Sequence, residues 1–282
     1  MAGALAIAAI GLASLCGSAA LAAEPATGAA TEAPWSRAKA AVDATESDIR
    51  TGGILAVRNH LADLEQALAA APRPAPQMQV IDGRAYVLVD GQAQALLATL
   101  TASAAPQPAG DAPREVVAVD DPYLMVSFYL GSYYNEVGQS SDALRVLDAG
   151  LAIEPRGWTL AGSHHVAIVT ERGAAHIASH NLIEALADYD GGLALQGVAP
   201  RDRARLLRGR GYALTELKRY DEAEDAYRQS LALEPGNSRA ESELQYIARV
   251  KAGGPTAPGG IISVQHPPAA SGGDAQSAQP QK

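Results

Sequence analysis

One spacing recurs three times between residues 131 and 233 of this 282-residue chain, and it constrains the fold more than any other feature. In each copy, a glycine is followed twelve residues later by an alanine that has an acidic residue directly before it. Eight residues after each alanine, a Leu-Ala-Ile or Leu-Ala-Leu triplet begins. The glycine–alanine pairs are Gly131 with Ala143, Gly173 with Ala185, and Gly211 with Ala223. Three copies of one spacing indicate a structural unit that repeats along the chain.

The composition favours closely packed helices as that unit. Hydrophobic residues make up 48% of the chain but aromatic residues only 5%, and alanine, the best helix former, supplies much of the difference. Small residues at fixed offsets on two helices let the backbones approach closely, and larger residues pack around the crossing. One such pair cannot bury its apolar face alone, so several pairs must stack and the end must be closed. We therefore predict a mostly α fold of antiparallel helix pairs.

The repeated residues resemble the tetratricopeptide repeat (TPR), a helix–turn–helix unit of 34 residues. The matching positions are Gly131, Tyr134, Ala143, Leu147 and Pro155 in the first unit, Gly173, Ala185, Tyr189 and Leu193 in the second, and Gly211, Ala223, Tyr227 and Pro235 in the third. The second unit departs from the family pattern, because His176 replaces the usual tyrosine and Gly197 stands where a proline ends the unit. In this register the units cover residues 124–157, 166–199 and 204–237 within a domain of residues 121–252, and a capping helix covers 238–252.

The units begin 42 and 38 residues apart instead of 34, so extra loop residues must lie between them, notably near Trp158 to His165.

Residues 35–71 also have helical periodicity, interrupted at Thr51-Gly52-Gly53. We expect this segment to form a helix pair that caps the stack or serves as a degenerate fourth repeat. Residues 253–282 are rich in Gly, Pro, Ala and Gln, which predicts a disordered tail.

Between the first helix pair and the repeats, residues 77–119 have a different pattern. Met78–Ile81 and Arg84–Val89 flank Asp82-Gly83, a strong two-residue hairpin signal. A short helix is predicted from Gln92 to about Thr101, and the β-branched run from Glu115 to Val119 is a candidate third strand. The expected architecture is therefore about three stacked helix pairs and a capping helix, preceded by a small unit that contains a β-hairpin.

The first 22 residues predict an export signal. They carry no charged side chain and end in Ala20-Leu21-Ala22, a small-x-small cleavage pattern, before a linker at residues 23–34. An uncleaved membrane anchor formed by residues 2–23 is the alternative, and a lipoprotein signal at Cys16 is disfavoured by the large Leu15 before it. Arginine is far commoner than lysine, which is typical of a GC-rich bacterial gene. We expect a periplasmic or secreted protein.

Charge and motifs disfavour several classes of function. A net charge of −9 and a pI of about 5.1 argue against a nucleic-acid partner. The sequence lacks the common nucleotide-binding, metalloprotease and serine-hydrolase motifs, so we expect no catalytic residues and no cofactor. Asp82 and Asp90 each precede a glycine, and turn formation explains both. His176 and His180 have metal-ligand spacing, but no cysteine or well-placed carboxylate completes a set, so we expect no metal.

The TPR resemblance implies that the first helix of each unit lines a concave groove that binds a protein or peptide. Transferred by register, the groove residues are Met125, Phe128, Ser132, Asn135, Thr170, Arg205, Arg208 and Tyr212. Arg205 and Arg208 share one helix face and are open to two interpretations. Either they belong to a solvated face neutralised by Asp202, Glu216 and Glu222, or they clamp a carboxylate in an acidic partner.

We therefore predict an exported adaptor or scaffold. The alternatives are an enzyme or accessory subunit that acts on envelope polymers through residues 77–119, and a protein whose repeats serve self-assembly. A membrane is expected as a partner only if the N-terminal segment is retained.

Overall fold

The structure is a computed structural model that describes residues 32–73, 78–104, 115–153 and 162–255, all of which belong to one unit. The predicted signal segment with Cys16, most of the linker, Pro155 and the tail from residue 256 lie outside the described residues. Within the described ranges, no helix has the length and apolar character needed to cross a bilayer.

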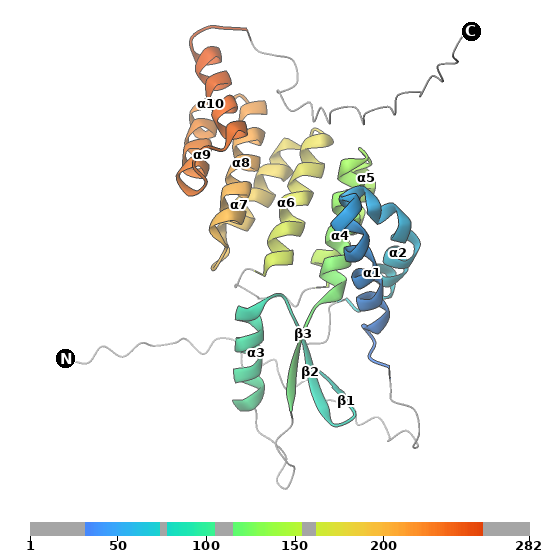
Figure 1. Ribbon diagram of the computed structural model, residues 1–282. Helices are drawn as coiled ribbons and strands as arrows, with labels where there is room; N and C mark the ends of the chain where they lie inside the picture. Colours follow the sequence, from blue (N-terminus) through green and yellow to red (C-terminus); the bar gives the residue numbers. More distant parts are fainter. Residues whose placement is uncertain (1–31, 74–77, 105–114, 154–161, 256–282) are drawn as a thin grey trace, which may run out of the picture. The chain divides into compact units, whose positions relative to one another are not determined.

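Seven helices between residues 122 and 251 form a stack of three pairs and a single last helix. They are α4 (Pro122–Glu136), α5 (Ser140–Leu151), α6 (Ser163–Ala178), α7 (Leu182–Ala194), α8 (Pro200–Glu216), α9 (Tyr220–Leu233) and α10 (Ser238–Lys251). The pairs are α4 with α5, α6 with α7, and α8 with α9, and each pair packs on the one before it (Figure 1). Helix α10 packs against α9 and α8. The predicted mostly α fold of stacked helix pairs with a closing helix is confirmed.

The three repeated glycines lie where the helices of a pair cross. Each lies inside the first helix of its pair, and a Cβ added there would overlap the side chain that follows sixteen residues later. The facing residues are Leu147 for Gly131, Tyr189 for Gly173, and Tyr227 for Gly211. The alanines of the same motif, Ala143, Ala185 and Ala223, are fully buried. The repeated spacing therefore marks positions where only a very small side chain fits.

The turns inside the pairs are equivalent as well. Seven residues after each repeated glycine, the backbone adopts a positive φ, with values of 75° at Gly138, 59° at His180 and 61° at Lys218. The second helix of each pair begins two residues later, at Ser140, Leu182 and Tyr220. A residue in the left-handed conformation thus reverses the chain at the equivalent position of all three units.

The first helix pair stacks on α4. It consists of α1 (Ser36–Gly52), a 3-10 segment η2 (Ile54–His60) and α2 (Leu61–Ala70), with the break at Gly53, where φ is 64°. All three segments contact α4, and α2 also contacts α5. Hydrogen bonds join the pair to the first repeat, with the Tyr134 hydroxyl donating to Glu65 at 2.8 Å. This is the place that a preceding repeat would take.

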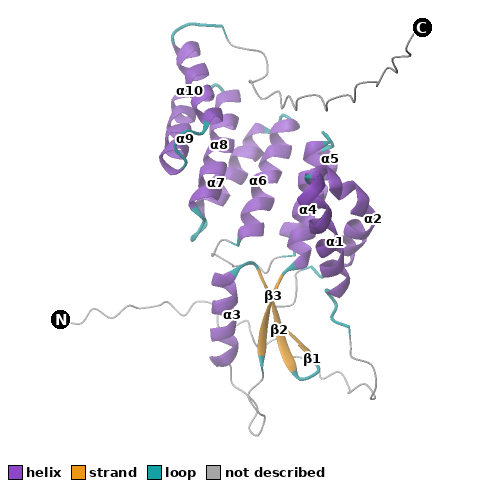
Figure 2. Ribbon diagram, viewed as in Figure 1, coloured by secondary structure: helices purple, strands orange, loops and turns teal. Residues whose placement is uncertain are grey.

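A small α/β unit precedes α4. Strands β1 (Gln79–Ile81) and β2 (Arg84–Val89) are antiparallel, which confirms the predicted hairpin, and β3 (Val116–Asp120) pairs with β2 in parallel (Figure 2). Helix α3 (Gln92–Ala104) connects β2 to β3 and packs on the sheet face that carries Val87 and Val89. On the opposite face, Tyr86 contacts Trp35 with ring centroids 5.4 Å apart.

Candidate partner-binding face

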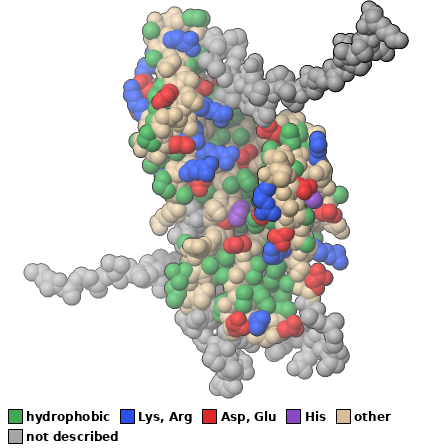
Figure 3. All heavy atoms as spheres, viewed as in Figure 1, with side chains coloured by type: hydrophobic (Ala, Val, Ile, Leu, Met, Phe, Trp, Pro, Cys, Tyr) green, Lys and Arg blue, Asp and Glu red, His purple; other side chains and the backbone are tan. Residues whose placement is uncertain are grey.

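The predicted groove residues lie on α4, α6 and α8, the first helices of the three pairs. Their exposure differs. Arg205 is exposed and Thr170 is buried, whereas the other six are half-buried: Met125, Phe128, Ser132, Asn135, Arg208 and Tyr212. In the space-filling view, Lys and Arg side chains gather in the hollowed middle of the visible face (Figure 3). We call the side of α4, α6 and α8 that carries these residues the first-helix face.

The residues on α4 are partly structural. Met125 and Phe128 pack against the core that α4 shares with α1 and α2, and the Phe128 ring lies 5.5 Å from that of Tyr129. The Ser132 hydroxyl is buried and has no hydrogen-bond partner among the described residues. On α6, Thr170 donates to the Val166 carbonyl of its own helix. Met125, Phe128, Ser132 and Thr170 therefore expose less surface to a partner than their predicted place in the groove implies.

Glu171 connects the three first helices and was not predicted as a site residue. The Asn135 side-chain amide of α4 donates to the backbone oxygen and to Oε2 of Glu171 on α6, both at 2.9 Å. From the other side, the Arg205 guanidinium of α8 donates to Oε1. Glu171 is only 9% exposed, so these partners compensate a carboxylate that lies largely out of water.

The arginines of α8 have partners other than those the sequence suggested. One of the two interpretations neutralised Arg205 and Arg208 with Asp202, Glu216 and Glu222, and these ion pairs are not the ones that the structure forms. Arg205 pairs with Glu171, Arg208 with Glu234, and Arg210 with Asp190. The physical reason is that stacked helices bring in carboxylates from 20 to 34 residues away, which are closer than those of the same helix.

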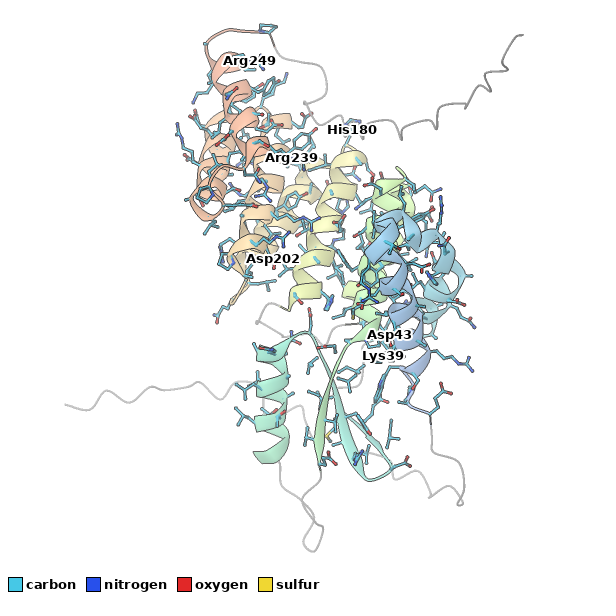
Figure 4. The ribbon with its side chains drawn as sticks, in the orientation of Figure 1. Lys39, Asp43, His180, Asp202, Arg239 and Arg249 are labelled. Carbon is cyan, nitrogen blue, oxygen red and sulfur yellow. The ribbon has the colours of Figure 1, made fainter. Side chains whose placement is uncertain are left out.

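The far end of α8 is acidic. Glu243 of α10 is 4% exposed, and burial, followed by the nearby charge of Glu216, raises its pKa above the usual range. Burial together with the same two carboxylates raises the pKa of Tyr212 to about 12. Along α8, the first-helix face thus changes from arginines near the beginning of the helix to carboxylates near its end. Figure 4 labels Asp202 at that beginning.

Asp90 does more than form a turn, which corrects the sequence interpretation. Its buried carboxylate accepts hydrogen bonds from the backbone amides of His164 and His165, at 3.1 and 2.8 Å, and lies 2.8 Å from Nδ1 of His164. Burial is the largest single effect on both side chains and opposes their ionisation, but their mutual hydrogen bond, the attraction of the opposite charges and the backbone hydrogen bonds to Asp90 together outweigh it. The pKa of Asp90 therefore lies below its usual value and that of His164 above. Asp90 therefore fixes the small α/β unit to the beginning of α6.

The histidines do not assemble a metal site in the part of the chain that the structure describes, where no three potential ligands lie together. His180 is exposed in its turn (Figure 4). Nε2 of His176 lies 3.9 Å from Asp188, whose carboxylate is bound by Arg172. Nδ1 of His176 is buried and has no hydrogen-bond partner among the described residues.

A cavity of about 390 Å³ lies among α5, α6 and α7. Val169 and Arg172 of α6 and the small residues Gly191 and Gly192 of α7 contribute to its wall. None of the predicted groove residues lines it. Sequence reasoning missed this cavity, although the adjacent glycines in the second helix of the pair were a visible signal.

Comparison with known proteins supports the repeat register. Residues 204–237 match the tetratricopeptide repeat family, and these are the bounds that the spacing predicts for the third unit. No curated protein shows significant similarity to the chain. Two of the similar solved structures are the first TPR domain of the human RPAP3 protein (24% identity over 46% of this chain and 93% of that one, TM-score 0.40) and the first TPR of Spaghetti (RPAP3) bound to the HSP90 peptide SRMEEVD (25% identity, 48% and 97%, TM-score 0.40). The third unit of this chain is therefore a tetratricopeptide repeat.

Proposed function

We propose that this protein is a non-catalytic scaffold that binds a protein or peptide partner on its first-helix face and works outside the cytoplasm. The observation that carries the proposal is the equivalence of the three helix pairs, one of which matches the tetratricopeptide repeat. Helical repeats bind partners through side-chain pockets along aligned helices and need no cofactor.

Arg205 is the side chain on this face best placed to meet an acidic segment of the partner. It is 48% exposed and uses one of its guanidinium nitrogens to bind Glu171, so further donors remain available. Arg208 is 18% exposed and already binds both Glu234 and Ser230. An acidic segment would therefore bind first at Arg205, and Arg208 would contribute only by exchanging its own partner.

Support for export comes from the N-terminal sequence. The run of 22 residues without a charged side chain ends in Ala20-Leu21-Ala22, and cleavage after Ala22 would leave a mature chain without cysteine. Such a chain suits an oxidising compartment. Retention of the segment would instead attach the protein to the membrane.

Amino-terminal sequencing of the protein from its native host tests the export proposal. We expect the chain to begin at Ala23 and to fractionate with the envelope. An intact Met1 on soluble cytoplasmic material would contradict it.

Partner capture tests the binding face. We expect the Arg205→Ala, Tyr212→Ala double variant to lose most of the protein that the wild type retains from envelope extract. The control is the Arg228→Ala, Arg249→Ala double variant, which removes two exposed arginines from α9 and α10. Equal capture by the wild type and the first variant, with unchanged thermal stability, would contradict the proposal.

The described residues of this region, 78–104 and 115–119, give no support to an enzyme centred on residues 77–119. Asp82 is exposed in the hairpin turn with φ of 49°. The Asp90 carboxylate is occupied by His164 and by two backbone amides of α6. Asp82 and Asp90 therefore have separate structural roles.

A further inference from the structure

The cavity among α5, α6 and α7 lies outside the predicted groove. Helix α6 packs against both α5 and α7 (Figure 1), whereas α5 and α7 do not approach each other closely within their described residues. The space of about 390 Å³ is bounded by apolar and small side chains, by the imidazole of His165 and by one ion pair, Arg172 with Asp188. Its volume lies near the lower end of the range for ligand pockets, about 300–1,000 Å³. The cavity can therefore take one large side chain.

The wall on α7 has a glycine where the other units have a side chain. Gly191 is exposed, and a Cβ added there would meet no atom within 4 Å. The equivalent residues, 42 positions before and 38 positions after it, are Ala149 and Gln229. A backbone without a side chain lets another group approach α7 closely.

The ion pair in the wall also distinguishes the second unit. Arg172 and Asp188 occupy the positions that Leu130 and Val146, both fully buried, occupy in the first unit. A buried ion pair costs more than an apolar pair, because two charges lose their hydration. The side chain of Asp188 is only 6% exposed, so this cost applies here. A polar wall at an otherwise apolar position indicates that the cavity recognises a ligand group.

Carboxylates hold the Arg172 guanidinium along its edges. Nε and Nη2 donate to Asp188, with Nε 3.0 Å from Oδ2, and Nη1 donates to Asp148 of α5 at 2.9 Å. The second of these contacts recurs between the second and third units, where Arg210 pairs with Asp190. Because all three nitrogens of Arg172 already have partners, the faces of its planar guanidinium are what it can offer to a further group.

These features determine which group would fit the cavity. A charged group is disfavoured, because Arg172 and Asp188 already bind each other. An apolar group is favoured by Leu151, Val169 and Ala187 in the wall. A flat group is favoured by the bare backbone of α7 and by the guanidinium face, on which aromatic rings stack.

We propose that this cavity binds an aromatic side chain of a protein partner, with its ring against the Gly191 backbone and the guanidinium face of Arg172. The cavity is a second contact site, because none of the predicted groove residues contributes to its wall. The inference rests on the proposed function only in taking the ring from a protein. Asp148 and Asp188 hold Arg172 in place before the ring binds, which lowers the cost of ordering this side chain.

Titration of the full chain with N-acetyl-phenylalanine methylamide tests the cavity, with the backbone amide resonances of α5, α6 and α7 followed by NMR. We expect saturable shifts on these helices in the millimolar range. N-acetyl-cyclohexylalanine methylamide has the same carbon skeleton but a saturated ring, and it should bind about threefold more weakly or less, because it lacks the π-face. Equal or tighter binding of the cyclohexyl probe would show a merely apolar cavity and overturn the proposal.

A variant that fills the cavity locates the binding. Gly191→Leu should abolish binding of the phenylalanine probe, because the added side chain would occupy the space that the ring needs. Gln229→Leu places leucine at the equivalent exposed position of the third unit, and this matched control should bind as the wild type does. The melting temperature of each variant verifies that it folds. Binding that survives Gly191→Leu, or shifts that never saturate, would overturn the proposal.

The double variant Arg172→Leu, Asp188→Val gives the second unit the apolar pair of the first. It should fold, since replacement of a buried ion pair by apolar residues is often neutral or stabilising. We expect it to bind the two probes equally, because the guanidinium face is gone. A persistent preference for the aromatic probe would contradict the role of Arg172 and overturn the proposal.

The outcome is separable from the test of the proposed function. Partner capture that depends on Arg205 and Tyr212, together with no saturable binding of the aromatic probe, would overturn this inference and leave the proposed function intact. Specific probe binding, together with capture that is independent of Arg205 and Tyr212, would support the cavity and contradict the first-helix face.

Discussion

The middle and last layers of the stack place the same residue type in the same position with opposite consequences. Between α6 and α8, Glu171 has an amide on one side and a guanidinium on the other. Between α8 and α10, Glu243 faces a second carboxylate and two tyrosines. The comparison teaches that the repeat position determines burial, whereas the neighbouring layers determine whether a buried charge is compensated.

The difference follows from the neighbours that each glutamate has among the described residues. Glu171 has a helix pair before it and another after it, and its two partners come from 36 residues upstream and 34 residues downstream. Glu243 lies on the last described helix and has a neighbouring layer only on the α8 side. Among the described residues, the last layer therefore has fewer neighbouring side chains that can compensate a buried charge than an internal layer has.

Glu171 and Glu243 are both compared at their contact with α8, so the comparison requires that α8 is packed firmly against its partner helix α9. Gly211→Leu tests this packing, and it has the largest expected effect. An added Cβ at Gly211 would already lie 2.9 Å from the Tyr227 ring, so the larger side chain must force α8 and α9 apart. We expect a loss of about 1–3 kcal/mol in the free energy of unfolding, from overpacking, measured by chemical denaturation.

Gly191→Leu is the matched control. This glycine also lies in a helix, α7, but a Cβ there would meet nothing within 4 Å. The control should keep wild-type stability or exceed it, because leucine is the better helix former. If Gly211→Leu unfolds at the same denaturant concentration as the wild type, the assigned crossing is wrong.

Glu171→Gln tests the compensated side of the comparison. The variant keeps an acceptor for Asn135 but removes the charge that binds Arg205. We expect a loss of about 1–2 kcal/mol, since hydrogen bonds to charged groups are the stronger ones. The measurement is the unfolding free energy at pH 7, with the exposed Glu184→Gln as control. A gain in stability would show that Glu171 is not compensated in the way the structure describes.

Glu243→Gln should have the opposite sign. Burial and Glu216 raise the pKa of Glu243 in the folded state, so the folded chain holds this proton more tightly than the unfolded chain does. The wild type therefore loses stability as the pH rises from about 4.3, the ordinary glutamate value, through the raised pKa. We expect the variant to be more stable by about 1 kcal/mol at pH 7, a gain that disappears below about pH 4.

Melting curves of the wild type and Glu243→Gln between pH 4 and pH 8 measure this difference. A difference that stays constant across the range would show that the carboxyl does not titrate with a raised pKa. A destabilised variant at pH 7 would show that the carboxylate already has a partner.

The helix pairs were predictable from the sequence because each depends on a local steric requirement. A residue without a side chain at Gly131, Gly173 and Gly211 is visible in one sequence, and the facing residue follows at a fixed offset. The hairpin at Asp82-Gly83 was equally local. In each of these features, the residues that determine the structure lie within about twenty positions of one another in the sequence.

The polar contacts were not predictable in this way. The partners of Arg205 and Arg208 are 34 and 26 residues away, and Asp90 binds a helix that begins 73 residues later. Which carboxylate pairs with which cation depends on how each helix pair is rotated relative to the next one in the stack. The spacing of the repeated residues does not specify this rotation. One signal was present for Asp90, since the first turn of α6 has two histidines and no acidic residue of its own.

The smallest expected effect concerns the turn that leads from α8 into α9, the helix against which α10 closes the last layer. Lys218 adopts φ of 61°, a conformation that costs a side-chain-bearing residue about 1 kcal/mol, whereas the first unit has a glycine at the equivalent position, Gly138. Lys218→Gly relieves the strain in the folded state but also gives the unfolded chain more freedom, which offsets part of the gain. We therefore expect a net stabilisation of about 0.5 kcal/mol, or a rise of roughly 1–2 °C in the melting temperature. Lys218→Ala is the control and should give no such rise, because alanine keeps the Cβ that makes this conformation unfavourable. A rise of the same size in both variants would trace the effect to loss of the lysine charge and contradict the strain assigned to Lys218.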